Sequence, residues 1–150
     1  MSTANDVVSN SEKISVMRVH PEAVLPTRAH KDDAGLDLYC LEDLVVESGH
    51  GKVAKTGIAV ALPGGHVGLV ADRSSLAKKG IKTAGGVIDA GYRGEIHIVL
   101  WNISSEPIYL KRGERIAQLL ILPMITPAVQ EVSALDETQR GSKGFGSTGS

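Results

Sequence analysis

The 150-residue chain has little cysteine, few aromatic side chains, no excess of charge of one sign and no long apolar run. Its single cysteine, Cys40, excludes an internal disulfide and favours a reducing compartment, where a small core residue is a more common role than a catalytic thiol. A net charge of −1 offers no basic field to a nucleic-acid backbone. The longest apolar run, 119–125, contains Pro123 and is too short to span a bilayer. We expect a cytoplasmic protein that binds neither nucleic acid nor membrane, with a nuclear or viral setting left open.

Hydrophobic residues nevertheless make up 42% of the chain and charged residues 22%, which is typical of a soluble globular domain with one core. The first 13 residues are polar and lack the apolar centre of a signal peptide, so we expect a disordered tail there.

Apolar and polar residues alternate with period two in several short stretches separated by glycine-rich turns, which predicts strands at 14–19, 36–40, 56–62, 66–70, 95–102 and 107–110. In 95–102 the residues Ile96, Ile98 and Leu100 share one face, and the mixed opposite face suits a sandwich partner or another subunit. The best helix candidate is 74–80, with a serine able to cap it and Gly80 placed to end it. The predicted fold class is all-β, a jelly-roll or barrel-like sandwich with one short helix.

Two polar segments in the first half of the chain could carry chemistry. Asp37 interrupts an apolar alternation; it is either a solvent-facing residue or a carboxylate that helps hold a divalent cation. Arg73 stands beside the hydroxyls of Ser74 and Ser75 at the start of the expected helix, which indicates an anion site or an ordinary capped turn.

Three further segments follow. In the hairpin-like stretch 84–95, two glycines let backbone groups approach a planar ligand, Asp89 could activate a water and Tyr92 could pack on a sugar; the alternative is a decorated loop. Gln118 lies in an apolar run and needs partners, more commonly backbone than water or phosphate. The last segment, 140–150, holds Phe145 among four glycines and three serines, as a disordered tail or a segment that closes on a ligand.

Taken in order, these segments resemble the five motifs of the trimeric deoxyuridine triphosphate nucleotidohydrolases (dUTPases). LPTRAHKDDAGLDL, GGVIDAGYRGE, GERIAQLLI and RGSKGFGSTG match, and the resemblance covers residues 25–149. It implies hydrolysis of dUTP to dUMP and pyrophosphate with Mg²⁺, an activity that limits uracil in DNA and supplies dUMP for dTMP synthesis. It also implies a homotrimer of jelly-roll-like subunits, with each active site drawn from three chains.

The resemblance also assigns roles. Asp89 would orient the water that attacks the α-phosphorus in line, and Tyr92 would lie under the deoxyribose and reject UTP. Asp37 would be an outer-shell partner of Mg²⁺, through water. The remaining substrate-binding residues would be Arg73, Ser74, Ser75 and Gln118 at the phosphates, Ala84, Gly86, Val87 and Ile88 around the uracil, and Arg140, Phe145, Gly146, Ser147 and Thr148 in a closing lid. The expected division is a tail (1–13), a β domain (14–133) and a flexible C-terminal arm that closes an active site (134–150).

This sequence departs from the family pattern at three positions. Asp72 and Ser75 stand where most dUTPases have Pro and Gly, so that Asp72 is expected to add negative charge near the anion site, and Lys143 replaces a usual Gly. The Arg-Ser-Ser-Leu-Ala stretch is closer to the related dCTP deaminases. In those enzymes a catalytic Glu occupies the position that is Val99 here. A valine side chain cannot shuttle protons, so this chain lacks the residue that deamination requires. The remaining alternative is a non-catalytic trimeric nucleotide-binding module.

Overall fold

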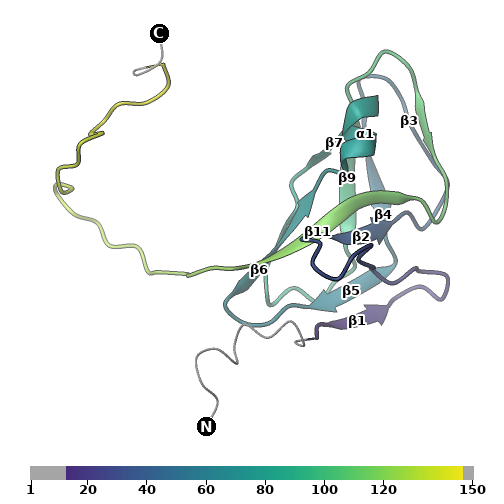
Figure 1. Ribbon diagram of the computed structural model, residues 1–150, viewed down its shortest axis with the longest axis horizontal. Helices are drawn as coiled ribbons and strands as arrows, with labels where there is room; N and C mark the ends of the chain where they lie inside the picture. The colour runs from purple at the N-terminus through teal and green to yellow at the C-terminus, as the bar shows by residue number, and fades with distance from the viewer. Residues whose placement is uncertain (1–12, 147–150) are drawn as a thin grey trace.

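The computed structural model describes residues 13–146, which form short β-strands, one helix and a long C-terminal extension (Figure 1). In chain order the strands are β1 (Ser15–Arg18), β2 (Leu36–Tyr39), β3 (Leu44–Val46), β4 (Gly51–Lys55), β5 (Ile58–Ala61), β6 (His66–Ala71), β7 (Ile81–Ala84), β8 (Val87–Ile88), β9 (His97–Asn102), β10 (Ile108–Leu110) and β11 (Arg115–Pro123). Helix α1 (Ser74–Lys79) lies between β6 and β7.

The strands pair antiparallel in four sheets. The two larger sheets have the orders β2-β11-β6-β8 and β4-β9-β7, while β1 pairs with β5 and β3 with β10. Within residues 13–146 these sheets do not close into a barrel. The prediction of an all-β, sandwich-type fold with one short helix is therefore confirmed, and the barrel form of it is not adopted.

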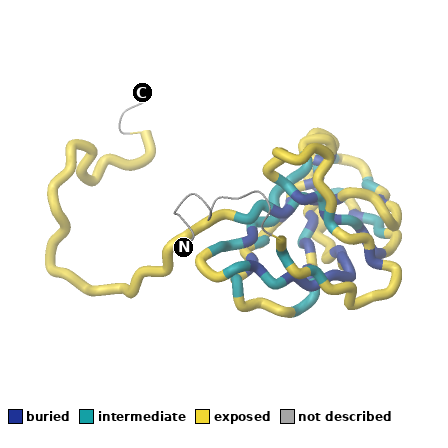
Figure 2. The backbone as a smooth tube through the Cα atoms, turned by 60° about the horizontal axis from the view of Figure 1, so that its bottom comes forward, coloured by how far each residue is buried: buried dark blue, intermediate teal, exposed yellow. Residues whose placement is uncertain are grey.

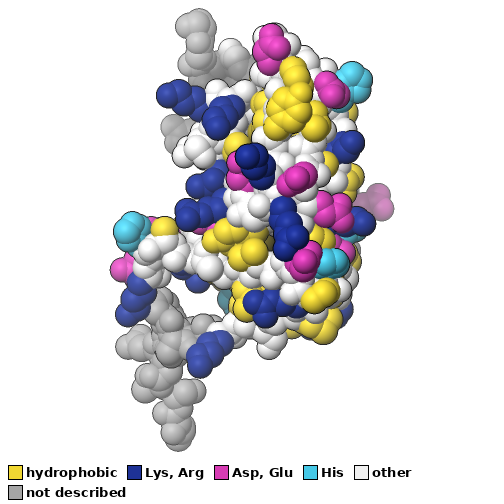
Figure 3. All heavy atoms as spheres, turned by 90° about the vertical axis from the view of Figure 1, so that its right-hand side faces the viewer, with side chains coloured by type: hydrophobic (Ala, Val, Ile, Leu, Met, Phe, Trp, Pro, Cys, Tyr) yellow, Lys and Arg dark blue, Asp and Glu magenta, His cyan; other side chains and the backbone are white. Residues whose placement is uncertain are grey.

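The core lies between the sheets, where buried backbone is concentrated (Figure 2). The predicted inward face of the β9 region is confirmed, because Ile96, Ile98 and Leu100 are at most 2% exposed. Each side chain of this size contributes about 1.5–3 kcal/mol when fully buried. The opposite face of β9 carries His97, Val99 and Trp101, none of which is buried. Over the face seen in Figure 3, apolar patches alternate with charges of both signs.

The alternation did not reveal β3, β4, β7, β8 or the longest strand, β11. It lies between β2 and β6, and Ile116, Ala117 and Leu119 are all at most 1% exposed. A strand with apolar residues on both faces lacks period two, so its pattern does not distinguish it from other apolar segments.

Helix α1 matches the expected position, but its start differs from the prediction. Arg73 is the N-cap residue in an extended conformation (φ −90°, ψ 131°), no side chain caps the helix, and Ser74 is already its first residue. The expected serine cap is therefore wrong. The helix ends as predicted at Gly80, whose φ of 108° is a left-handed conformation that glycine adopts without strain.

Beyond β11 the chain leaves the domain. The Met124 N–H donates to the Gly65 carbonyl (2.9 Å), and residues 125–146 are exposed and form no helix or strand. This extension runs well away from the sheets (Figures 1 and 2). No helix in the described part of the chain is long and apolar enough to cross a membrane.

Candidate active site

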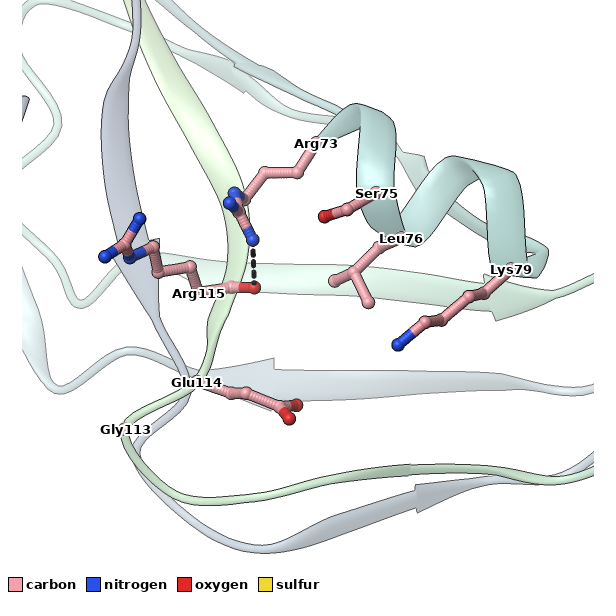
Figure 4. Close-up of a pocket in the computed structure, with 7 residues that line it drawn as sticks. All are labelled: Arg73, Ser75, Leu76, Lys79, Gly113, Glu114 and Arg115. Atoms are coloured by element: carbon pink, nitrogen blue, oxygen red, sulfur yellow. Dashed lines mark hydrogen bonds between the residues drawn. The ribbon is translucent and has the colours of Figure 1, made fainter. Parts of the chain in front are cut away.

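The first candidate pocket lies beside α1 and has a volume of about 340 Å³ (Figure 4). Its lining includes three cationic side chains, one hydroxyl and one carboxylate: Arg73, Ser75, Leu76, Lys79, Gly113, Glu114 and Arg115. Arg73 and Ser75 were predicted to bind phosphate, and the Ser75 hydroxyl points into this space (Figure 4). Ser74 is exposed on the first turn of α1 and is not among the lining residues. The pocket therefore combines the donors that an anion requires.

Asp37 lies between two arginines at this pocket. Arg73 Nε is 3.4 Å from Asp37 Oδ1, and Arg115 Nη1 is 3.7 Å from Oδ2. Arg73 Nη1 also donates to the Arg115 carbonyl (3.1 Å). The Asp37 side chain is 16% exposed, so the carboxylate orients both guanidinium groups from a partly shielded position and leaves one net positive charge.

Arg115 and Lys79 were not among the residues predicted for the site. Arg115 begins β11, which is distant in sequence from α1, whereas Lys79 ends α1 itself. The sequence showed a positive charge, Arg115, close to Gln118. It did not show that β11 pairs with β2, which is what brings Arg115 to Asp37.

Gln118 is placed by its contact with the chain just before α1. Its Nε2 donates to the Asp72 carbonyl (2.8 Å), the backbone contact that a buried amide makes most often. A Cβ on Gly35 would overlap Gln118 Oε1, so the absence of a side chain at Gly35 allows this position. The predicted contact of Gln118 with phosphate or metal-bound water stays a prediction.

Asp72 does not charge the phosphate pocket, contrary to the expectation. It is not among the lining residues, and its carboxylate accepts hydrogen bonds from Lys82 Nζ (2.8 Å) and from the backbone N–H (2.7 Å) and hydroxyl (2.6 Å) of Thr83. Burial alone would raise the pKa of Asp72, but these hydrogen bonds and the Lys82 charge outweigh it and hold the pKa below its ordinary value.

The second candidate pocket, of about 230 Å³, lies at the hairpin that follows β7. Gly86, Val87, Ile88, Asp89 and Tyr92 all line it, whereas the predicted Ala84 is exposed nearby and is not among its lining residues. The chain turns at Gly85 and Gly86 with φ of 69° and 95°, and a Cβ on Gly86 would lie 3.1 Å from the Val70 carbonyl. Glycine is therefore required for this close approach.

Within this pocket the two side chains predicted to act on the substrate differ in their contacts. The Tyr92 hydroxyl donates to the Glu95 carbonyl (2.8 Å), which fixes the direction of the ring. The exposed Asp89 carboxylate makes no hydrogen bond or ion pair with any residue that the structure describes, so it can accept one from water. No lining residue is common to the two pockets.

The C-terminal extension is not brought to either pocket. Arg140 Nε donates to the Lys143 carbonyl (2.9 Å), and the Lys143 N–H donates back to the Arg140 carbonyl (3.3 Å), closing a local turn. Phe145 and Gly146 are exposed. Ser147 and Thr148 lie outside the described residues.

The donor set for a divalent metal is sparse. Among residues 13–146 no group of three His, Cys, Asp or Glu side chains comes together. Asp37 is the one carboxylate bonded to the guanidiniums of the first pocket, so these residues fit a metal that arrives with its own phosphate and water ligands.

Comparison with known proteins decides the family. The dUTPase family model matches residues 21–149. The chain belongs to the dUTPase family. Deoxyuridine 5′-triphosphate nucleotidohydrolases of Corynebacterium glutamicum and Rhodococcus erythropolis are 49% and 44% identical, over 91% and 95% of this chain and 94% and 89% of theirs.

Solved dUTPases show the same fold. A mutant of the Staphylococcus bacteriophage 80alpha dUTPase with dUpNHpp superposes with a TM-score of 0.88 and 32% identity, covering 93% of this chain and all of that one. A mutant dUTPase of phage phi11, described with a structural Mg(II) ion, has a TM-score of 0.77 and 30% identity over 82% of this chain and 98% of that one. The dUTPase family hydrolyses dUTP and uses a divalent metal.

Proposed function

We propose that this dUTPase hydrolyses dUTP to dUMP and pyrophosphate through an in-line attack of water on the α-phosphorus. The observation that carries this proposal is the second pocket, where Asp89 and Tyr92 face the same space as the Gly86–Ile88 backbone. Asp89, with no protein partner there, accepts a proton from the attacking water and orients it. The Tyr92 ring lies against the deoxyribose, and the backbone at 84–88 reads the uracil edge. Such an enzyme limits uracil in DNA and supplies dUMP for dTMP synthesis.

The first pocket supplies the phosphate side. The guanidinium of Arg73, oriented by Asp37, and the Ser75 hydroxyl bind phosphate oxygens. Ser74 and Gln118 do not line this pocket, and we propose that they contact the phosphates once substrate is bound. Phosphoryl transfer depends on positioning and on charge neutralisation more than on covalent chemistry. Mg²⁺ bound to the triphosphate would neutralise its charge further, with Asp37 reaching the ion through water rather than as a direct ligand.

We further propose that each active site is shared between subunits of a homotrimer. On one chain the phosphate pocket and the nucleoside pocket have no lining residue in common, which supports completion of each by another subunit. A second support is the outward face of the β4-β9-β7 sheet. Val53 and Trp101 are 53% and 45% exposed on that face of a single chain. Contact with another subunit would cover these apolar side chains.

The C-terminal arm (134–150) is proposed to act as the lid of such a shared site, while 14–133 form the β domain. Arg140 would reach the γ-phosphate, Phe145 would stack on uracil, and Gly146, Ser147 and Thr148 would close round the phosphates. The support is that residues 125–146 leave their own domain without packing on it. A segment ordered by substrate excludes water from the reaction.

The decisive experiment is pyrophosphate release from dUTP, dCTP, dTTP and UTP. We expect turnover of dUTP, with the other three hydrolysed at least about a hundredfold less efficiently, because the site reads both base and sugar through hydrogen bonds and close packing. No release from dUTP at micromolar enzyme would leave the non-catalytic binding module as the function. Ammonia release from dCTP would identify a deaminase instead.

A further inference from the structure

Asp72 connects the phosphate pocket and the nucleoside pocket of one chain. It follows the last residue of β6 and directly precedes Arg73, whose guanidinium lies in the phosphate pocket. Its side chain turns the other way and bonds to Thr83, eleven residues later, at the end of β7. The segment 84–88, which forms the base-reading turn of the proposed function, begins at the next residue.

Every acceptor atom of Asp72 is engaged. Oδ1 accepts from the backbone N–H and the hydroxyl of Thr83 (2.7 and 2.6 Å), and Oδ2 accepts from Lys82 Nζ (2.8 Å). The backbone carbonyl accepts from Gln118 Nε2 (2.8 Å). Hydrogen bonds to a charged acceptor are stronger than neutral ones, and Thr83 is only 8% exposed, which limits competition from water.

The turn that begins after Thr83 has few other attachments. Gly85 and Gly86 give it a flexible backbone, and the strand that follows, β8, is two residues long and pairs with β6 only at Gly68–Ile88 and Leu69–Val87. The Val70 N–H donates to the Gly86 carbonyl (2.8 Å) on the same side. The other side is held by β7, which pairs with β9 as far as Ala84 and whose Lys82 and Thr83 are bonded to Asp72. Because Gly85 and Gly86 are flexible, the position of the turn depends on the attachments at its two ends, and removing the hydrogen bonds at one end would let the turn shift.

We propose that Asp72 is a positioning residue for the dUTPase reaction: it fixes the base-reading turn at 84–88 relative to the phosphate-binding segment at Arg73. This inference rests on the proposed function. The proline that most dUTPases carry here has no side-chain acceptor, so the contact is a feature of chains with Asp at this position. Asp72 touches no substrate atom. Its effect is on how well the turn distinguishes uracil from other bases.

The test compares Asp72→Ala, Asp72→Asn and Thr83→Val by pyrophosphate release with dUTP, dCTP and dTTP. In Asp72→Ala we expect KM for dUTP to rise about tenfold and the preference for dUTP over dCTP and dTTP to fall by a similar factor, as expected for loss of charged hydrogen bonds. Thr83→Val, which keeps the backbone N–H, should show the same changes to a smaller extent. Asp43→Asn is the matched control, because Asp43 Oδ1 also accepts a backbone N–H, from Arg112 (2.9 Å), and should leave the preference unchanged.

A purely structural role predicts a different result. General destabilisation reduces the amount of folded enzyme, so kcat falls while KM and the base preference stay as in the parent. That pattern in Asp72→Asn and Thr83→Val would overturn the inference even if Asp72→Ala does not fold. Amide hydrogen exchange across 84–88 is measured in parallel; it should be faster in the Asp72 and Thr83 variants, and unchanged exchange would also overturn the inference. A parent protein that does not hydrolyse dUTP would contradict the proposed function alone, because the exchange experiment does not depend on turnover.

Discussion

Gly35 lies beneath the side chain of Gln118, and this contact makes Gly35→Ala a sharp test of how the phosphate pocket is assembled. A Cβ at this position would overlap Gln118 Oε1 and lie 2.9 Å from its Cδ and 3.0 Å from its Cβ. Rotation of the Gln118 side chain relieves the contacts with Oε1 and Cδ but not the one with Cβ. That atom is fixed by β11, where Gln118 pairs with Asp37 on β2.

The magnitude follows from these two consequences. Turning the amide away breaks the hydrogen bond from Gln118 Nε2 to the Asp72 carbonyl, at a cost of about 1 kcal/mol. Displacing a paired central strand to admit a methyl group costs about 1–3 kcal/mol. The sum, about 2–4 kcal/mol, corresponds to a fall in Tm of about 5–15 °C for a domain of this size. Turnover should fall as well, because Gln118 is proposed to contact the phosphates.

Thermal unfolding at fixed protein concentration and pyrophosphate release measure the two effects. Gly64→Ala is the control: nothing lies within 4 Å of its added Cβ and its φ is not positive, so it should change stability by no more than about 0.5 kcal/mol. In a Gln118→Ala background most of the collision is gone, so Gly35→Ala should cost less there than in the parent. Equal costs in both backgrounds, or a Gly35→Ala protein as stable as Gly64→Ala, would refute this account of the packing.

Other predictions concern the chemistry. Asp89→Asn should bind a non-hydrolysable dUTP analogue normally in calorimetric titration and lower kcat by about 10²–10⁴-fold, whereas an unchanged rate would remove Asp89 as the base. Deleting 140–150 should leave the sedimentation mass that of a trimer and lower kcat/KM at least about a hundredfold, and a fully active truncated protein would exclude a lid. Ser75→Gly should change the KM for dUTP only modestly, because its hydroxyl is one of several donors in a pocket that also holds Arg73, Lys79 and Arg115 (Figure 4); a loss of all activity would contradict this. Since the folded pKa of Asp72 is depressed, its stabilisation is complete above the unfolded pKa and is lost as pH falls below about 4, so melting curves of the parent and Asp72→Asn should converge in acid.

The parts of the fold that the sequence predicted are those decided by local chemistry. The alternation in 95–102 is preserved in β9 because one of its faces is buried and the other is not. The glycine that ends α1 acts through its own left-handed backbone. Several strands escaped prediction, and the longest of them, β11, carries apolar residues on both faces, which hides any alternation. The predicted cap of α1 was wrong because Arg73, rather than a serine, occupies the N-cap position, and its side chain bonds to Asp37 and Arg115 instead of capping the helix.

The same distinction explains the candidate site. Gly86, Asp89 and Tyr92 lie close together in the sequence, and a single hairpin brings them to one pocket, as their sequence suggested. Asp72, in contrast, was expected to repel phosphate because its neighbour Arg73 binds an anion. Its orientation depends on Thr83 and Lys82, whose position is set only when β7 packs beside β9. A charge next to a site in sequence therefore says little about the field within it until its partner is known.

The bonds of Asp72 to Lys82 and Thr83 also change how the replacement of Pro by Asp at this position should be understood. A carboxylate that is fully hydrogen-bonded to a lysine and a threonine adds almost no net charge to its surroundings, so replacing Pro by Asp is compatible with phosphate binding nearby. What the replacement adds is an attachment between two segments that, in the proposed trimer, would serve different active sites: the phosphate pocket of one and the base-reading turn of the next. Any movement of the base-reading turn when substrate binds would then reach Arg73 of the same chain through Thr83 and Asp72. Loss of that attachment should consequently change the base preference at one site and the phosphate affinity at its neighbour together, rather than either alone.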